Sequence, residues 1–320
     1  MTEDVAATKP HIHVACGALR DPQGRVLLVE RPLGKIAALK WEFPGGKIEP
    51  GETPRAALDR ELHEEISIKV TQARPLTLFT HEYAERTVSL HAFLVTAWEG
   101  EVHGREGQRL AWELPWARHG LDVLPTVNPI LYALQLPDEY AFTRPNATEA
   151  SILGGLPFLR RGTLLRLRLP TLSRSAYADL AKRIIAAARP WGLPVVLDRG
   201  EAMARFLGAA GVHFPQATLM QLQPNDLAPV YNVMRFASCH DVESLRHAAM
   251  LGLDAAVIGH VRDTASHSDR PPIGWAGFQD LVASTPMPAY AIGGLTPEHK
   301  AEAFAHYAQG VCGISAYWRR

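Results

Sequence analysis

The second half of the chain alternates short apolar runs with helical stretches, and this alternation restricts the possible fold more than any other feature. Helical periodicity is clear in SAYADLAKRIIAAARPWG and DVESLRHAAMLG. The apolar runs around them are YAFTR, LLRLRLP, PVVLD, AGVHFP, VMRFASC, DAAVIGH, PAYAIGG and GVCGISA. Strands and helices that alternate at this spacing form βαβ units around a parallel sheet. Because there are about eight strands, we predict an α/β fold of the (β/α)8 barrel type.

The first half has a different pattern. IHVACGAL and RVLLVER are apolar or alternating and are separated by the turn sequence RDPQG, so they predict a hairpin. RTVSLHAFLVTAWEG is typical of a further strand, and NPILYALQL of a closing helix. Together they indicate an α+β domain. The turn-rich segment QLPDEYAFTRPNATEAS follows, and we place the boundary there, with domains at 1–136 and 137–320.

Composition excludes several classes of function. The 33 basic and 33 acidic residues give a formal net charge of zero, so nothing indicates a surface for a nucleic acid polymer. Cys16, Cys239 and Cys312 are too few and too scattered for a disulfide framework or a zinc site. The start, MTEDVAATKP, is unlike a signal peptide, and no apolar run approaches the roughly 20 residues of a membrane span. We expect a cytoplasmic protein with no membrane partner, whose oligomeric state stays open.

The segment WEFPGGKIEPGETPRAALDRELHEEISI, residues 41–68, predicts a helix with an acidic face. Thr53 can cap it and Pro54 suits its first position. Glu61 lies three residues before Glu64 and four before Glu65, so the three share one face with Cβ atoms about 5–6 Å apart. Such repulsion disfavours the helix in water, whereas a bound Mg²⁺ or Mn²⁺ would reverse it. The alternative is an ordinary solvated face.

The spacing of this segment resembles the Nudix box. Gly46, Glu52, the run Arg60-Glu61-Leu62-x-Glu64-Glu65 and the apolar Ile68 all match. The resemblance implies a mixed sheet sandwiched by helices and hydrolysis of a nucleoside diphosphate linked to another group. It implies that Glu52 and Arg60 pair. Its implied metal ligands are Glu61, Glu64 and Glu65 with the backbone of Gly45 and Gly46, and its catalytic residues include Glu61, Glu65 and Arg60. Ser67 replaces the usual Gly, and we expect a small change where the helix ends.

Residues 10–135 resemble more closely the Nudix hydrolases of the MutT type, which convert 8-oxo-dGTP to 8-oxo-dGMP and pyrophosphate. EFPGGKIEPGETP carries this resemblance, and WEGEVHGREGQ places Glu106 as a further metal carboxylate or base. LPTVNP places Asn128 where an amide, with its donor and its acceptor, can read a guanine edge. The resemblance implies these substrate-binding residues: Arg31, Glu42, Phe43, Pro44, Gly45, Arg86 and Asn128. The simpler alternatives are a helix cap for Asn128, a surface strand position for Arg31, core packing for Phe43 and a solvated loop for Glu106.

The barrel half resembles thiamine-phosphate synthase and its relative TenI, with AIGGLTPE as the best local match. The resemblance implies that Gly293, Gly294 and Ser315 bind a phosphate. His260 matches a TenI histidine and is either an acid or base or a buried structural residue.

Three departures in this half argue against the synthase reaction. Pro170 stands where the family has a lysine, His267 where it has a phosphate-contacting lysine, and Thr218 where it has a metal-binding Asp. We expect the barrel to bind a phosphorylated small molecule, as a tautomerase-like or binding module. Two alternatives stay open: a Nudix domain that acts on a thiamine-pathway diphosphate and feeds the barrel, and a barrel that is only a sensor.

Overall fold

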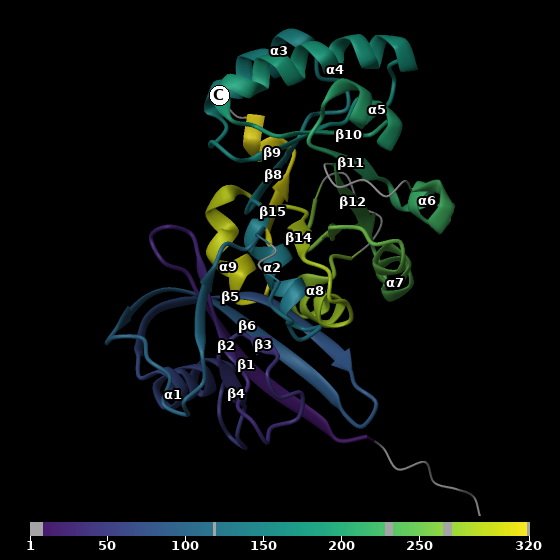
Figure 1. The fold of residues 1–320 in the computed structure, drawn as a ribbon. Helices are drawn as coiled ribbons and strands as arrows, with labels where there is room; N and C mark the ends of the chain where they lie inside the picture. Colours follow the sequence, from purple (N-terminus) through teal and green to yellow (C-terminus); the bar gives the residue numbers. More distant parts are fainter. Residues whose placement is uncertain (1–8, 118–119, 228–232, 265–270, 319–320) are drawn as a thin grey trace, which may run out of the picture. The chain divides into compact units, whose positions relative to one another are not determined.

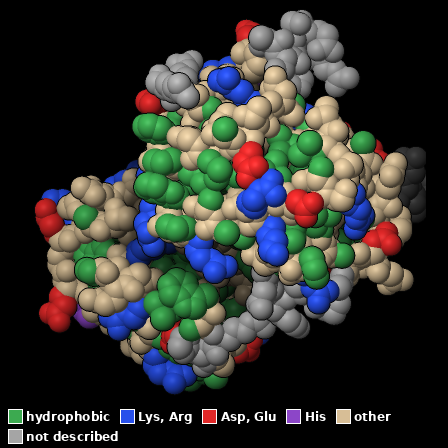
Figure 2. Space-filling model, turned by 90° about the horizontal axis from the view of Figure 1, so that it is seen from above, with side chains coloured by type: hydrophobic (Ala, Val, Ile, Leu, Met, Phe, Trp, Pro, Cys, Tyr) green, Lys and Arg blue, Asp and Glu red, His purple; other side chains and the backbone are tan. Residues whose placement is uncertain are grey.

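The computed structural model describes residues 9–117, 120–227, 233–264 and 271–318 (Figure 1). The chain divides into two compact units, Met1–Gln135 and Leu136–Arg320. Within the described ranges, no helix is both long enough and apolar enough to cross a bilayer. Acidic, basic and hydrophobic side chains are interspersed over the face drawn in Figure 2, in keeping with the balanced charge of the sequence.

The first unit is built on two sheets. In the four-stranded sheet, of order β4-β1-β6-β5, β1 and β6 run parallel and the other pairs are antiparallel. The three-stranded sheet has the order β3-β2-β7 and is antiparallel. The strands are β1 (His11–Leu19), β2 (Val26–Glu30), β3 (Trp41–Glu42), β4 (Gly45–Lys47), β5 (Lys69–Glu82), β6 (Thr87–Glu99) and β7 (Leu110–Glu113). This confirms the predicted mixed architecture, with β6 and the closing helix α2 (Val127–Gln135) where the sequence indicates them.

The predicted hairpin of β1 and β2 is wrong. Both strands form, and a turn closes between them with the N–H of Gly24 donating to the carbonyl of Asp21. Beside this turn, the N–H of Asp21 donates to the carbonyl of Arg25 and an isolated antiparallel bridge joins Arg20 to Val26, but the two strands then enter different sheets. The partners of β1 are β4 and β6, and β6 begins 68 residues after β1 ends, so local turn chemistry does not reveal this pairing.

One helix packs on each face of these sheets. The helix α1 (Pro54–Ile66) buries Ala57, Leu58, Leu62 and Ile66 against one face, and α2 packs in the cluster on the other. Successive strand residues point to opposite faces, so Ala15 joins the α1 cluster and Cys16 the α2 cluster. A Cβ on Gly17 would lie 2.9 Å from Leu62 Cδ1, so this glycine lets α1 approach the sheet closely.

The ends of α1 follow from its sequence. Thr53 Oγ1 accepts from the N–H of Ala56 at 3.2 Å, and Pro54 opens the first turn, as predicted. Ser67 takes the left-handed conformation, φ 63°, and its N–H donates to the carbonyl of His63. The expected change at the helix end is therefore absent, because Ser67 adopts the conformation that a glycine would take more easily.

The second unit is a closed barrel of eight parallel strands in the order β10-β11-β12-β13-β14-β15-β8-β9, which confirms the predicted fold. Its strands are β8 (Glu139–Phe142), β9 (Leu164–Leu167), β10 (Val195–Leu197), β11 (Gly211–Phe214), β12 (Met234–Cys239), β13 (Ala255–Ile258), β14 (Ala289–Ile292) and β15 (Gly310–Gly313). Helices surround the strands (Figure 1): α3 (Glu149–Gly155), α4 (Arg174–Ala188), α5 (Glu201–Leu207), α6 (Gln216–Leu219), α7 (Val242–Met250), α8 (Gly274–Ala283) and α9 (Lys300–Ala305). Short 3₁₀ turns are η1 (Leu156–Phe158), η2 (Arg189–Trp191), η3 (Pro224–Asp226), η4 (Pro297–His299) and η5 (Ser315–Trp318).

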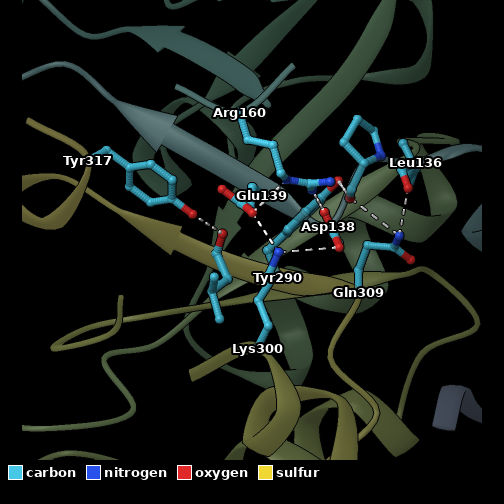
Figure 3. A network of polar contacts seen from close by, with 10 residues as sticks. Leu136, Asp138, Glu139, Arg160, Tyr290, Lys300, Gln309 and Tyr317 are labelled. Carbon is cyan, nitrogen blue, oxygen red and sulfur yellow. Dashed lines mark hydrogen bonds and ion pairs between the residues drawn. The ribbon is translucent and has the colours of Figure 1, made fainter. Parts of the chain in front are cut away.

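An ionic network anchors the first barrel strand (Figure 3). Glu139, the first residue of β8, is 4% exposed and accepts from Arg160 Nε at 2.8 Å and from Lys300 Nζ at 2.6 Å. Arg160 also pairs with Asp138. Two acidic and two basic groups thus balance where the chain enters the barrel, and the buried carboxylate keeps its counter-charges.

Candidate active site

The acidic face of α1 is organised around one arginine. Arg60 donates from Nε and Nη2 to the two carboxylate oxygens of Glu52, both at 2.9 Å, and from Nη2 to the carbonyl of Lys47 at 3.0 Å. Its Nη1 donates to Glu61 at 2.9 Å and to Glu64 at 3.3 Å. The hydrogen bond from Arg60 lowers the pKa of Glu52 to about 2. The predicted Glu52–Arg60 pair is confirmed, and as a bidentate pair it fixes the loop before α1 against the helix.

Two glycines of β4 bring the backbone against the same carboxylates. Gly45, with φ 145°, pairs with Cys16 of β1, and its N–H donates to Glu65 Oε2 at 3.0 Å. A Cβ on Gly46 would lie 2.3 Å from the carboxyl carbon of Glu61. Gly46 is therefore in direct contact with Glu61, and only a residue without a side chain allows this approach.

Glu65 is partly buried and shares its surroundings with other acidic groups. Burial raises its pKa to about 7, the Gly45 N–H opposes the rise, and repulsion from Glu42 and Glu61 adds to it. Burial also raises the pKa of Glu42, although Arg31 Nη1 lies 2.5 Å from its carboxylate and lowers it. Acidic groups that repel one another in a partly buried place are stabilised by a cation.

Glu106 reaches this region from the loop between β6 and β7. The N–H of Arg105 and the side-chain amide of Gln108 donate to the carbonyl of Glu65, at 3.0 and 3.1 Å, and tie the loop to the end of α1. The carboxylate of Glu106 pairs with Lys35 Nζ at 2.7 Å. The loop is therefore fixed at the end of α1, and the carboxylate of Glu106 is held there by Lys35.

The contacts explain how the carboxylates are held. Among the residues that the structure describes, no three His, Cys, Asp or Glu side chains converge as metal ligands. Arg60 engages Glu61, the Gly45 N–H engages Glu65, and Lys35 engages Glu106. The donor set still fits Mg²⁺ or Mn²⁺, because it consists of oxygen atoms and because the carboxylates repel one another in the absence of a divalent ion.

A second group of predicted residues meets at one end of the barrel. The Gly293–Gly294 turn follows β14, with φ 108° and 65°, and a Cβ on Gly293 would lie 2.4 Å from the Cβ of His260. The exposed Ser315 follows the neighbouring strand β15. Gly293, Gly294, Ser315 and His260 therefore lie at the carboxyl ends of the strands, where such barrels bind their ligands.

The barrel interior carries polar groups close to this end. Arg166 is 3% exposed and donates from Nε to Asp198 at 2.7 Å. The Tyr140 hydroxyl lies 3.2 Å from Nδ1 of His213, and Nε2 of His213 lies 2.9 Å from the Ser238 hydroxyl. Burial, with repulsion from Arg166, lowers the pKa of His213 well below its ordinary value, so this imidazole is neutral.

Comparison with known proteins supports the predicted family of each half of the chain. Residues 9–121 match the model of the NUDIX domain, and residues 142–317 match the model of thiamine monophosphate synthase. The chain belongs to both families. An 8-oxo-dGTP diphosphatase of Proteus vulgaris is 43% identical over 99 residues, which are 31% of this chain and 88% of the relative. A CTP pyrophosphohydrolase of Escherichia coli (strain K12) is 36% identical over 116 residues, 36% of this chain and 86% of the relative. A putative thiamine-phosphate synthase 2 of Aquifex aeolicus (strain VF5) is 26% identical over 191 residues, 58% of this chain and 99% of the relative. The Nudix domain makes the chain a hydrolase.

Of three other residues predicted to bind substrate in the Nudix domain, one is exposed and two are buried. Asn128 is exposed and is the second residue of α2, so the alternative that it caps the helix is wrong. Phe43 is 4% exposed in the core cluster with Trp41 and Val127, which is the packing role weighed for it. Pro44 is also buried, and its carbonyl accepts from the backbone of β1 at 2.9 Å.

Arg86 does not join the acidic site. It lies in the turn between β5 and β6, next to Thr87, which pairs with His11. Gly45 pairs with Cys16, five residues further along β1. At about 3.3 Å per residue, roughly 17 Å of strand separates the two positions.

Three positions of the barrel differ from the synthase pattern. Pro170 lies in the exposed turn after β9, and its carbonyl accepts from Arg199. Thr218 lies in α6, and His267 lies outside the described residues.

The interior polar groups were missed by the sequence reasoning. A signal for them was present, because LLRLRLP carries two arginines, Arg166 and Arg168, in a strand that both faces should bury.

Proposed function

We propose that the Nudix domain hydrolyses 8-oxo-dGTP to 8-oxo-dGMP and pyrophosphate with Mg²⁺ or Mn²⁺, a reaction that clears an oxidised nucleotide. The observation that carries this proposal is the contact of Gly45 and Gly46 with Glu65 and Glu61 on the acidic face of α1. The relative from Proteus vulgaris, named for this activity, is matched over 88% of its length.

Glu61, Glu64, Glu65 and Glu106, with the carbonyls of Gly45 and Gly46, would hold the metal. A divalent ion bound there supplies charge neutralisation for phosphate oxygens and lowers the pKa of bound water.

The other roles belong to the chain itself. Arg60 orients Glu61 and is itself held by Glu52. Glu65, whose carboxylate accepts from the Gly45 N–H, is placed to hold the ion that activates the attacking water. The exposed amide of Asn128 can donate to and accept from a guanine edge. Arg31, paired with Glu42, offers a cation for a phosphate or a base.

A cytidine triphosphate is the second candidate substrate, because a CTP pyrophosphohydrolase is matched at 36% identity. Hydrolysis should therefore be profiled over 8-oxo-dGTP, dGTP, CTP and thiamine-related diphosphates, each with Mg²⁺ and with Mn²⁺. We expect the highest kcat/KM for 8-oxo-dGTP. A profile led by CTP or by a thiamine-related diphosphate would refute the assignment.

The metal-site roles are tested by charge-neutral variants. Glu61→Gln and Glu65→Gln should abolish hydrolysis while the chain stays folded, because each removes one proposed ligand charge. Glu82→Gln is the matched control, since this exposed glutamate lies at the far end of β5. Near wild-type turnover in either site variant at saturating Mg²⁺ contradicts its role.

We infer that the barrel binds a phosphorylated small molecule at the carboxyl ends of its strands. The N–H groups of the Gly293–Gly294 turn and the Ser315 hydroxyl would hold the phosphate, and His260 could move a proton. Pro170 and Thr218 supply neither the cation nor the carboxylate that pyrophosphate displacement requires. We therefore expect the barrel to act as a tautomerase-like enzyme or as a sensor of its ligand.

Two measurements on the full chain test this inference. Calorimetry with a thiazole phosphate should show binding that Ser315→Ala weakens. A synthase assay should show no thiamine phosphate. Formation of thiamine phosphate would contradict the expected lack of synthase activity. Absence of binding at millimolar thiazole phosphate would contradict the proposed phosphate site.

A further inference from the structure

The segment between β2 and β3, residues 31–40, forms an arm beside the acidic site. Its base is closed by backbone hydrogen bonds from Arg31 to the carbonyl of Lys40 and from Leu39 to the carbonyl of Arg31, at 2.9 and 3.0 Å. Residues 33–37 at its tip are exposed. Ala37 and Leu39 are left-handed, with φ 56° and 67°, which non-glycine residues rarely adopt.

Lys35, at the tip of this arm, faces several acidic groups of the site. Its ammonium pairs with Glu106 at 2.7 Å. Burial raises the pKa of Glu42 and of Glu65, and the positive charge of Lys35 opposes both rises. One lysine thus lies within electrostatic range of three carboxylates that come from three separate segments.

We propose that Lys35 is an exchangeable counter-ion: it holds Glu106 while the site lacks metal, and it transfers to the phosphate oxygens of the nucleotide when a divalent ion takes that carboxylate. The inference rests on the proposed role of Glu106 as a metal ligand. Lys35 then has a role in substrate binding that its place in the loop sequence RPLGKIAALK does not indicate.

The contacts favour exchange over a permanent ion pair. The side chains of Lys35 and Glu106 are 46% and 45% exposed, and such pairs are weak in water. A divalent ion binds a carboxylate more strongly than an ammonium does at the same distance, because its charge is twice as large. The released ammonium has three N–H donors for phosphate oxygens, and the exposed arm leaves it free to reorient.

Mn²⁺ binding without nucleotide tests the first half. In full-length Lys35→Met, calorimetry or the free-Mn²⁺ resonance signal should report about two- to fivefold tighter Mn²⁺ binding, because a competing cation is lost. Lys35→Arg should bind as the wild type does. Lys40→Met is the matched control, since Lys40 is on the same arm but pairs with Asp122 at 2.7 Å. In a Glu106→Gln background, Lys35→Met should give a clearly smaller gain, because only the longer-range effect of Lys35 on Glu65 remains. Unchanged Mn²⁺ affinity in Lys35→Met, or a gain that is just as large without Glu106, overturns the proposal.

Steady-state kinetics test the second half. At saturating Mg²⁺, Lys35→Met should raise KM for the nucleoside triphosphate by about fivefold or more, because a charge-assisted phosphate contact is lost. Lys35→Arg should keep the KM, and Lys40→Met should not change it. An unchanged KM in Lys35→Met overturns the transfer to phosphate. The Mn²⁺ measurements need no substrate, so they decide the counter-ion role even if 8-oxo-dGTP proves to be the wrong nucleotide.

Discussion

Gly46→Ala should inactivate the Nudix domain without unfolding it. The added Cβ would lie 2.3 Å from Cδ and Oε1 of Glu61 and 2.4 Å from Oε2. An ordinary contact is about 3.4 Å or longer, so the carboxylate must retreat by about 1 Å. A misplacement of about 1 Å at a catalytic group costs roughly 10²-fold in rate. At about 1.36 kcal/mol per tenfold, this is about 2.7 kcal/mol of transition-state stabilisation.

The assay is kcat/KM for 8-oxo-dGTP at saturating Mg²⁺, with urea unfolding measured in parallel. Gly154→Ala is the control, because an added Cβ there meets nothing within 4 Å. Should Gly46→Ala also lose stability, the double variant with Glu61→Ala removes the overlapping atoms and should be as stable as Glu61→Ala alone. A Gly46→Ala enzyme within twofold of wild-type activity would refute the reasoning from this contact.

Three further outcomes are expected. Asn128→Ala should reduce the preference for 8-oxo-dGTP over dGTP by about tenfold, as loss of one well-placed hydrogen-bond partner predicts, whereas an unchanged ratio of kcat/KM values means that another group reads the base. Glu139→Gln should lower the free energy of unfolding by about 2 kcal/mol, because it leaves Arg160 and Lys300 short of a counter-charge. In the control, Glu149→Gln breaks an exposed pair with Arg183 and should lower the free energy of unfolding by less than about 1 kcal/mol. Burial, with repulsion from His13, lowers the pKa of His91 from 6.5 to about 4, so the unfolded chain takes up a proton first. At about 1.36 kcal/mol per pKa unit, stability should fall by about 2–3 kcal/mol as pH drops from 6.5 to 4. His91→Asn should lack this decrease in urea titrations, and an unchanged pH dependence would contradict it.

Features with a local cause could be predicted from the sequence. The helix α1 begins at Pro54 because Thr53 caps it, and the face of Glu61, Glu64 and Glu65 follows from helical spacing alone. The pair of Glu52 and Arg60 spans only eight residues and carries a recognisable spacing. The barrel was also predictable, because each strand is a short apolar run next to a helix and neighbouring strands follow one another in the chain.

Pairings between distant segments were decided only by the tertiary structure. The sequence pattern pairs β1 with β2 and does not predict β5. The sequence of β5, KVTQARPLTLFTHE, contains Pro75, and its pairing with β6 has register shifts. Lys35 meets Glu106 across 71 residues, and Arg166 meets Asp198 across 32. Which face a strand side chain occupies depends on register with partners far along the chain, so neither pair has a local signature. The sequence by itself therefore determined the acidic face of α1 and the barrel, while only packing decided that Lys35 pairs with Glu106 and Arg166 with Asp198.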